Sequence, residues 1–260
     1  MSELAVTWWG HSSMSIELGD VTVATDPLLT RQLYHLRRLT PAPPAAAATA
    51  DVVLVSHQHY DHLHLPSLDR FDRDVPVVVP RGAPRVVRGL DRRRIIEVVP
   101  GDTVEVAGLT IEVLPAHHDG RRNVFSRREA VVPPIGFRFT DGVSRVWYPG
   151  DTGVRELDGV GPVDLAAVPI GGWGPTLGEE HLDPEQAAEA VRQVGARWSL
   201  AVHYGTFWPV ALRRLHPENH RRLFVTPPLR FHRAIEDLGV DTLALTPVHG
   251  TRLALLPAPA

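Results

Sequence analysis

The stretch "SHQHYDHL", residues 56–63, follows the apolar run "VVLV" and holds three histidines and an aspartate within six positions. Unpaired polar groups lose hydration when they are buried, so such a cluster at a strand end needs either solvent or a bound partner. His57 and His59 are two residues apart and can reach one ion, whereas Asp61 and His62 lie just beyond and can reach a second. Imidazole and carboxylate groups are suitable ligands for Zn, Mn or Fe. The stretch predicts a metal site, and a solvated histidine-rich loop is the alternative.

Further ligand-type residues stand at the ends of other predicted strands. The run "LTIEVL" leads into "PAHHD" with His117 and His118, "SRVW" leads into "YPGDTG" with Asp151, and "WSLAV" leads into "HYGTF" with His203. Each residue has an ordinary interpretation as a turn, capping or core residue. A carboxylate or imidazole at four successive strand ends is better explained by one shared site.

The composition is typical of a globular protein and excludes several classes of site. The length suits one α/β domain spanning residues 1–260, and 43% hydrophobic residues can form a sizeable core. No cysteine is present, so any metal must bind nitrogen and oxygen, and we expect a cytoplasmic protein. A net charge of −3 argues against a dedicated nucleic-acid binder. No run approaches the ~20 apolar residues of a membrane span, and "MSELAVTWWG" lacks signal-peptide features.

Short strand-like runs separated by turn signals dominate the chain, from "LAVTWW" and "MSIEL" near the start to "WSLAV" and "TLALTPV" near the end. Two β-rich halves, each closing with a helix and a strand, predict an α/β fold of two packed sheets with helices outside, a four-layer αββα sandwich. Residues 31–50 contain the low-complexity run "PAPPAAAATA" and are predicted to be irregular, long enough for a functional loop.

Helix signals are fewer. The clearest helix lies in "DPEQAAEAVRQVG", with Asp183 as N-cap, Pro184 at the first position, Gln186 at the third and Gly195 as the stop. A second helix, "PLRFHRAIEDLG", is expected to end at Gly239, and "PSLDRF" and "GAPRVVRGL" predict short helices.

Motifs along nearly the whole chain resemble the metallo-β-lactamase fold superfamily. More narrowly, they resemble the branch of N-acyl-phosphatidylethanolamine-hydrolysing phospholipase D and L-ascorbate-6-phosphate lactonase. The motifs are "TWWGHSSMSIEL", "ATDPLL", "SHQHYDHL", "PAHH", "YPGDTG", "VDLAAVPIGGW", "HLDPEQA", "VHYGTFW" and "VHGTRL". The resemblance implies an αββα sandwich with a dinuclear metal site at its open sheet edge.

The resemblance also implies roles for individual residues. Two divalent ions, expected to be Zn with Mn or Fe as alternatives, would be held by seven ligands: His57, His59 and His118 for one ion, Asp61, His62 and His203 for the other, and a bridging Asp151. The choice of His118 over His117 rests on the Pro-x-x-His pattern of the branch. His181, in "HLDPEQA", would face the site from the start of a helix without binding metal. His11, Asp26 and His249 would organise loops by hydrogen bonding.

Two departures from the branch bear on the substrate. Asp119 stands where an aromatic residue often follows the histidine, and "VTWWG" begins at residue 6, without the membrane-facing extension of the mammalian phospholipase. Both argue against simply assuming the lipid substrate of the branch.

Candidates for substrate binding come from loops beside the ligands. Four arginines follow His118 closely and can neutralise a phosphate, with a solvated loop as the alternative: Arg121, Arg122, Arg127 and Arg128. Trp173 and Phe207 follow strand ends and can wall a pocket, although core packing explains them equally well.

The expected function follows from the ligand set. Two metal ions lower the pKa of a shared water and hold the resulting hydroxide against an electrophile. We expect a hydrolase of a phosphodiester or another phosphate-bearing small molecule or lipid, with Asp61, Asp151 and His181 as catalytic residues. The alternatives are a lactonase or amidase and a non-catalytic metal-binding scaffold. The sequence leaves the natural substrate, the native metal and the oligomeric state open, a homo-oligomer included.

Overall fold

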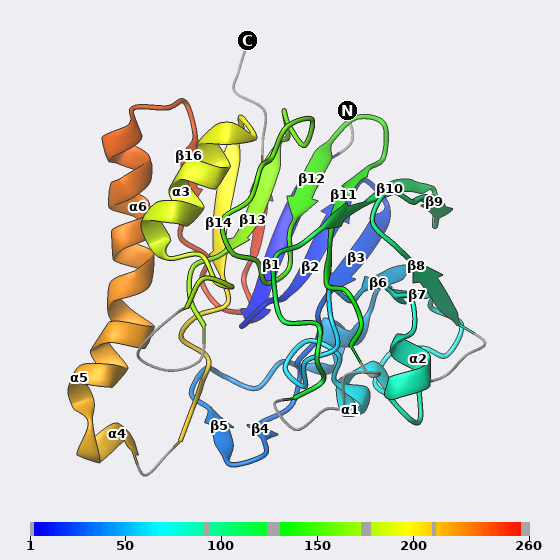
Figure 1. Ribbon diagram of the computed structural model, residues 1–260, viewed down its shortest axis with the longest axis horizontal. Helices are drawn as coiled ribbons and strands as arrows, with labels where there is room; N and C mark the ends of the chain where they lie inside the picture. Colours follow the sequence, from blue (N-terminus) through cyan, green and yellow to red (C-terminus); the bar gives the residue numbers. More distant parts are fainter. Residues whose placement is uncertain (1–2, 91–93, 124–130, 173–177, 210–211, 256–260) are drawn as a thin grey trace.

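The computed structural model describes residues 3–90, 94–123, 131–172, 178–209 and 212–255 (Figure 1). Two seven-stranded sheets dominate it. The first sheet has the strand order β17 (Arg252–Leu255), β1 (Leu4–Gly10), β2 (Ser13–Leu18), β3 (Val21–Thr25), β6 (Val52–Leu54), β7 (Val77–Pro80) and β8 (Ile95–Val98). The second has the order β16 (Leu243–Leu245), β14 (Trp198–Val202), β13 (Leu165–Pro169), β12 (Arg145–Tyr148), β11 (Ile135–Thr140), β10 (Leu109–Pro115) and β9 (Thr103–Val106).

Both sheets combine antiparallel and parallel pairing. In the first sheet β17, β1, β2 and β3 pair antiparallel and β3, β6, β7 and β8 pair parallel. In the second sheet β9 to β12 pair antiparallel and β12, β13, β14 and β16 pair parallel. Parallel strands direct their carboxyl ends to one edge, so the residues that follow β6, β13 and β14 can gather there.

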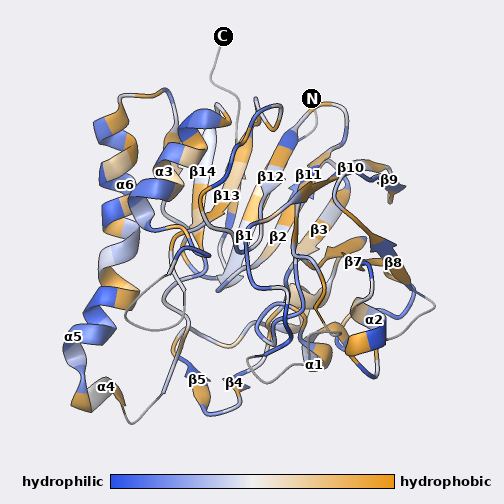
Figure 2. Cartoon of the chain, in the orientation of Figure 1, coloured by the Kyte–Doolittle hydropathy of each residue, from blue (hydrophilic) through white to orange (hydrophobic). Residues whose placement is uncertain are grey.

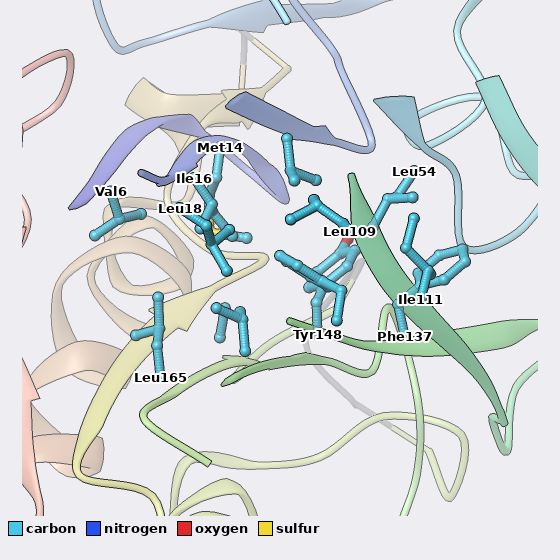
Figure 3. Close-up of a cluster of buried hydrophobic side chains, with 14 of the residues drawn as sticks. Val6, Met14, Ile16, Leu18, Leu54, Leu109, Ile111, Phe137, Tyr148 and Leu165 are labelled. Atoms are coloured by element: carbon cyan, nitrogen blue, oxygen red, sulfur yellow. The ribbon is translucent and has the colours of Figure 1, made fainter. Parts of the chain in front are cut away.

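The main core lies between the two sheets. Ile16 and Leu54 of the first sheet pack in one buried cluster with Ile111, Phe137 and Leu165 of the second (Figure 3). These side chains alternate with residues that face the outer layers, as a period of two residues requires. Most strand residues are hydrophobic, whereas the long helices carry mixed faces (Figure 2). The sheet-on-sheet core explains why strand runs dominate the sequence.

Helices cover the outer faces of both sheets. On the second sheet, α3 (Pro184–Gln193) packs against α6 (Thr226–Leu238) and β13. On the first, the short helices η1 (Ala45–Ala48), α1 (Leu65–Leu68) and α2 (Ala83–Val86) share a third buried cluster with β6 and β7. The four-layer αββα sandwich predicted from the sequence is therefore the observed fold.

The two helices predicted from capping and stop residues, α3 and α6, are confirmed. Asp183 caps α3, its side chain accepting from the Gln186 peptide N–H at 2.8 Å while the Gln186 side chain accepts from the Asp183 N–H at 3.0 Å. Gly239 ends α6 in the left-handed conformation with φ 60°.

The prediction of an irregular segment over residues 31–50 is partly wrong. Residues 32–38 form a hairpin of β4 (Gln32–Leu33) and β5 (Leu36–Arg38), and β15 (Phe207–Trp208) adds a third strand. Strands of two or three residues are too short to show a period, and the hairpin pairs with a strand almost 170 positions away. No helix in the described ranges is long and apolar enough to cross a membrane.

Candidate metal centre

The stretch that follows β6 folds into a tight, buried turn. The peptide N–H groups of His62 and Leu63 both donate to the carbonyl of His59, at 3.1 and 2.9 Å. This turn brings His57, Asp61 and His62 inward, where all three are buried, and leaves His59 half-buried.

The other predicted ligands arrive from the second sheet. His118 follows β10, Asp151 follows β12 and His203 follows β14, and all three meet the turn at one edge of the sandwich. Gly150 permits the approach of Asp151, since it has a φ of 64° and a Cβ there would lie 2.4 Å from the Cβ of Ser56. The backbone of His203 is also left-handed, with φ 60°. Such a backbone costs energy in a non-glycine residue and is common at functional sites.

The seven predicted ligands come together in two groups. The first group is His57, His59 and His118, whose ligand atoms lie within 4.8 Å of one another. The second group is Asp61, His62 and His203, which meet the same limit together with His11. Asp151 lies between the groups, its Oδ2 being 2.9 Å from His203 Nε2, 3.3 Å from His62 Nε2 and 3.9 Å from His118 Nε2. The ligand-type residues thus form two neighbouring groups with one carboxylate between them.

Hydrogen bonds fix one ring nitrogen of four histidines. The Nδ1 atoms of His118 and His203 donate to the carbonyls of Glu180 at 3.0 Å and Gly171 at 2.8 Å. His62 Nδ1 lies 2.6 Å from Asp26 and His57 Nδ1 lies 2.9 Å from the Ser56 hydroxyl, which itself donates to Asp26. Such partners orient the ring and leave Nε2 as the coordinating atom.

The remaining atoms fit a divalent cation. Among the described residues, four buried atoms of the seven predicted ligands make no hydrogen bond, although His203 Nε2 is ion-paired with Asp151: His57 Nε2, His62 Nε2, His203 Nε2 and Asp151 Oδ1. Buried polar atoms without partners are costly, and an ion bound between them would remove that cost. Imidazole nitrogens with carboxylate oxygens form a donor set that zinc, manganese and iron accept.

Asp26 connects the two groups through its contacts with His62 and with Ser56, the partner of His57. It accepts from the Ser56 peptide N–H at 2.7 Å, from the Ser56 hydroxyl at 2.5 Å and from the Tyr148 hydroxyl, besides its contact with His62. All four residues are buried. His11 and His249 also make hydrogen bonds as expected, His11 Nε2 lying 2.9 Å from Asp61 and His249 Nε2 donating to the Trp9 carbonyl at 2.9 Å.

The charges in the two groups differ. Burial lowers the pKa of His57 well below its usual 6.5 and that of His59 to about 4. Burial also opposes charge on His62 and His203, but the neighbouring carboxylates, Asp151 foremost, together outweigh it, raising the pKa of His62 well above 6.5 and that of His203 to about 9. Burial alone would raise the pKa of Asp151, yet His203 and His62 hold it well below its usual range.

His117 and His118 have different surroundings. The His118 ring enters the cluster, with Nε2 3.2 Å from His59 Nδ1, whereas the His117 side chain is exposed. His181 lies beside the cluster, its ring centroid 4.8 Å from that of His118 and its buried Nδ1 3.9 Å from Asp151 Oδ2. Burial lowers the pKa of His181 to about 4, so the ring is neutral at pH 7. Gly172 makes room for it, because a Cβ there would lie 3.0 Å from the ring.

The predicted substrate-binding residues are placed very differently. Arg121 is exposed and pairs with Asp119 at 2.7 Å. Arg122 is half-buried and donates to three backbone carbonyls of the turn after β6. Phe207 is buried and lies edge-on to His11. Trp173, Arg127 and Arg128 lie outside the described residues.

A cavity of about 1090 Å³ opens on the cluster. His59, Asp61, His181 and His203 form its floor, and its walls come from the β4–β5 hairpin, from residues 204–209 and from described residues between 212 and 230. The apolar wall residues include Leu33, Leu36, Phe207, Trp208, Leu223 and Phe224. Leu223 and Phe224 belong to a π-helical turn, η3 (Arg221–Val225), that the sequence did not single out. No local pattern marks it, whereas Tyr60, another wall residue, lies inside the histidine-rich stretch.

Comparisons with known proteins agree with this geometry. A family model described as "Beta-lactamase superfamily domain" matches residues 22–204. The N-acyl-phosphatidylethanolamine-hydrolyzing phospholipase D 1 of Caenorhabditis elegans is 30% identical, over 79% of this chain and 65% of that protein. A UPF0173 metal-dependent hydrolase of Methanopyrus kandleri is 28% identical, over 92% of this chain and 94% of its own. Igni18, a metallo hydrolase of Ignicoccus hospitalis, has a similar fold, with a TM-score of 0.72 at 22% identity over 98% of this chain and 99% of that one.

The chain therefore belongs to the beta-lactamase superfamily, as its motifs indicated. The resemblance to the phospholipase branch is confirmed by the Caenorhabditis relative.

Proposed function

We propose that this protein is a metal-dependent hydrolase that binds two divalent ions, expected to be zinc, at the two groups. The observation that carries the proposal is a set of four buried ligand atoms that make no hydrogen bond, within the described residues, in a cluster whose His59, Asp61 and His203 line a large cavity. The cavity also favours an enzyme over a metal-binding scaffold, since a scaffold has no need of a chamber above its metals. The Methanopyrus relative, named a metal-dependent hydrolase, supports the same reaction class.

Three residues are assigned to the chemistry. Two bound divalent ions would lower the pKa of a water between them and supply a nucleophile at neutral pH. Asp151 and Asp61 are carboxylates at that pH, because neighbouring histidines hold their pKa values well below the usual range despite burial. Either can accept a proton from an attacking water. His181 is neutral, lines the cavity and can donate a hydrogen bond to the leaving group or to the developing anion.

The substrate we propose is a phosphodiester or another phosphate-bearing molecule with a sizeable apolar part. The apolar wall of the cavity supports the apolar part of this substrate. Support for its phosphate is weaker. Two of the three described arginines that line the cavity are engaged, since Arg122 donates to backbone carbonyls and Arg230 pairs with Glu185, and the third, Arg222, is exposed. We therefore assign recognition of the phosphate to the metal centre rather than to the loop after His118.

A carbonyl substrate, a lactone or an amide, is the second candidate. The engagement of Arg121 with Asp119 and of Arg122 with carbonyls favours it, since neither guanidinium is free for an anion. The same two carboxylates and His181 would serve a tetrahedral intermediate at carbon.

The test is a substrate panel on one preparation. The protein is stripped of metal, reloaded with two equivalents of Zn, Mn or Fe, and assayed with model phosphodiesters, phosphate-bearing lactones, plain lactones and amides. Turnover restricted to phosphate-bearing substrates supports the first candidate, and turnover of plain lactones or amides supports the second. A chain that binds no metal tightly would contradict the proposal as a whole.

A further inference from the structure

Arg122 lies where the two ligand-bearing segments of the first group meet. It follows His118 by four positions, and its guanidinium is directed back at the turn that carries His57 and His59. His118 Nε2 and His59 Nδ1 are only 3.2 Å apart, so a small shift of either segment would open the first group.

The contacts of Arg122 all fall on the backbone of that turn. Its Nη1 donates to the carbonyl of Gln58, to the carbonyl of Leu63 at 2.8 Å and to that of His59 at 3.3 Å. These carbonyls flank the ligands on both sides. A planar guanidinium can reach several acceptors at once, which the point charge of a lysine cannot.

Two further contacts hold the same junction. The Arg122 guanidinium carbon lies 4.0 Å from the centre of the Tyr60 ring, between the ligand-type residues His59 and Asp61. From the other direction, the Gln58 side-chain amide donates to the Gly120 carbonyl at 2.6 Å. The segments 57–63 and 117–123 are thus cross-linked on both sides of the His59–His118 contact.

The second group shares the turn, because Asp61 and His62 lie on it, but its side chains have further supports outside the segment 117–123. His62 is fixed by Asp26, His203 by the Gly171 carbonyl and Asp61 by His11, and none of these partners belongs to the segment 117–123. Loss of the guanidinium should therefore act on the two groups unequally.

We infer that Arg122 is a positioning residue that sets the geometry of the first metal site by holding the turn 57–63 against the His118 segment, and not a substrate-binding residue. The inference rests on the proposed dinuclear centre. The loss of a residue that positions metal ligands typically weakens metal affinity about 10- to 100-fold.

The experiment compares Arg122→Ala and Arg122→Lys with Arg121→Ala as the matched control. Arg121 is the adjacent arginine, exposed and paired only with Asp119 among the contacts the structure describes. Each metal-free protein is titrated with Co²⁺, followed by absorption spectroscopy and calorimetry, and the melting temperature is measured without and with metal.

We expect the unaltered protein and Arg121→Ala to bind two equivalents with the same two affinities. Arg122→Ala should weaken one of the two by about 10- to 100-fold and change the spectrum of that ion alone. Arg122→Lys should recover only part of the loss, because it keeps the charge without the planar fork.

Other outcomes are distinct. If Arg122→Ala lowers the melting temperatures with and without metal equally and leaves the ratio of the two affinities unchanged, the arginine is merely structural and the inference is wrong. If Arg122→Ala binds metal normally and only the KM rises, Arg122 binds substrate. If the unaltered protein binds no Co²⁺, the proposed function fails instead.

Discussion

The two groups of ligand-type residues are built in opposite ways. In the first group, His59 is half-buried, and the turn is held by Arg122, which donates to its carbonyls, and by Gln58, which donates to the Gly120 carbonyl. In the second group, Asp61, His62 and His203 are all buried and are held by carboxylates that pair with the rings. The second group can compensate its own charges without metal, whereas the first places imidazoles together with no carboxylate among them. We therefore expect the two groups to differ in stability, metal affinity and response to pH.

The largest effect should come from Asp151→Asn, since Asp151 lies between the two groups and close to ligand atoms of both. Its carboxylate lies within 4 Å of His62, His118 and His203, so the substitution should weaken both metals and remove a proton acceptor. We expect turnover to fall by on the order of 10³-fold or more, equivalent to about 4 kcal/mol. Steady-state kinetics and elemental analysis measure it, with Asp119→Asn as control. Loss of one metal only would show that Asp151 does not bridge.

His181→Ala should have the next largest effect. It tests whether His181, which belongs to neither group, takes part in catalysis. A donor to the transition state should cost on the order of 10²–10³ in kcat, with both metals retained and the melting temperature unchanged. His117→Ala is the control, because that side chain is exposed one position before a ligand. Lost metal or stability in proportion to lost activity would assign His181 to the loop instead.

A pair of substitutions compares the groups directly. His203→Ala removes a buried partner of Asp151, so the metal-free protein should lose about 1–3 kcal/mol of unfolding free energy. His59→Ala removes a half-buried, neutral ring, so the metal-free protein should melt almost normally, while its metal content and the stabilisation by metal fall. Melting curves of chelator-treated and metal-loaded samples measure both. Equal destabilisation of the metal-free forms would remove the distinction.

The smallest effect is the dependence of metal-free stability on pH. His57 and His59 have lowered pKa values in the fold, so their contribution is lost as pH falls below 6.5, that of His59 as pH falls through about 4. His62 and His203 have raised pKa values, so their contribution is complete below pH 6.5 and is lost at higher pH, that of His203 as pH rises through about 9. The melting temperature of the metal-free protein should therefore be highest near pH 6.5.

Bound metal should abolish the fall in melting temperature above pH 6.5, because a liganded histidine carries no proton on its coordinating nitrogen. Differential scanning calorimetry between pH 5 and 9.5, with and without two equivalents of Zn²⁺, measures the difference. A metal-free profile that keeps rising from pH 6.5 to 9 would contradict the assignment of charge to the second group.

The sequence predicted those features whose signals are local. Alternation and turn residues located the strands, and the α3 capping box is complete within four residues, from Asp183 to Gln186. The strand-end residues His118, Asp151 and His203 could be proposed as neighbours because one edge of a sandwich collects strand ends. Their role as ligands stays a prediction.

Contacts between segments that are distant in the chain could not be predicted from the sequence. Arg121 and Arg122 are adjacent and chemically identical. Arg121 nevertheless pairs with Asp119 at the surface, whereas Arg122 donates to backbone carbonyls of the turn after β6. The hairpin of residues 32–38 likewise looked irregular, because its third strand comes from residues 207–208.

The amino-acid sequence by itself determined the αββα sandwich, the capped helix and the supply of imidazole and carboxylate groups at strand ends. These follow from periodicity and capping, which act over a few residues. Only the tertiary structure decided that His118 rather than His117 enters the cluster, and which walls enclose the cavity. The physical reason is that the partner of a side chain is set by what packs beside it, and packing joins segments that are far apart in the chain.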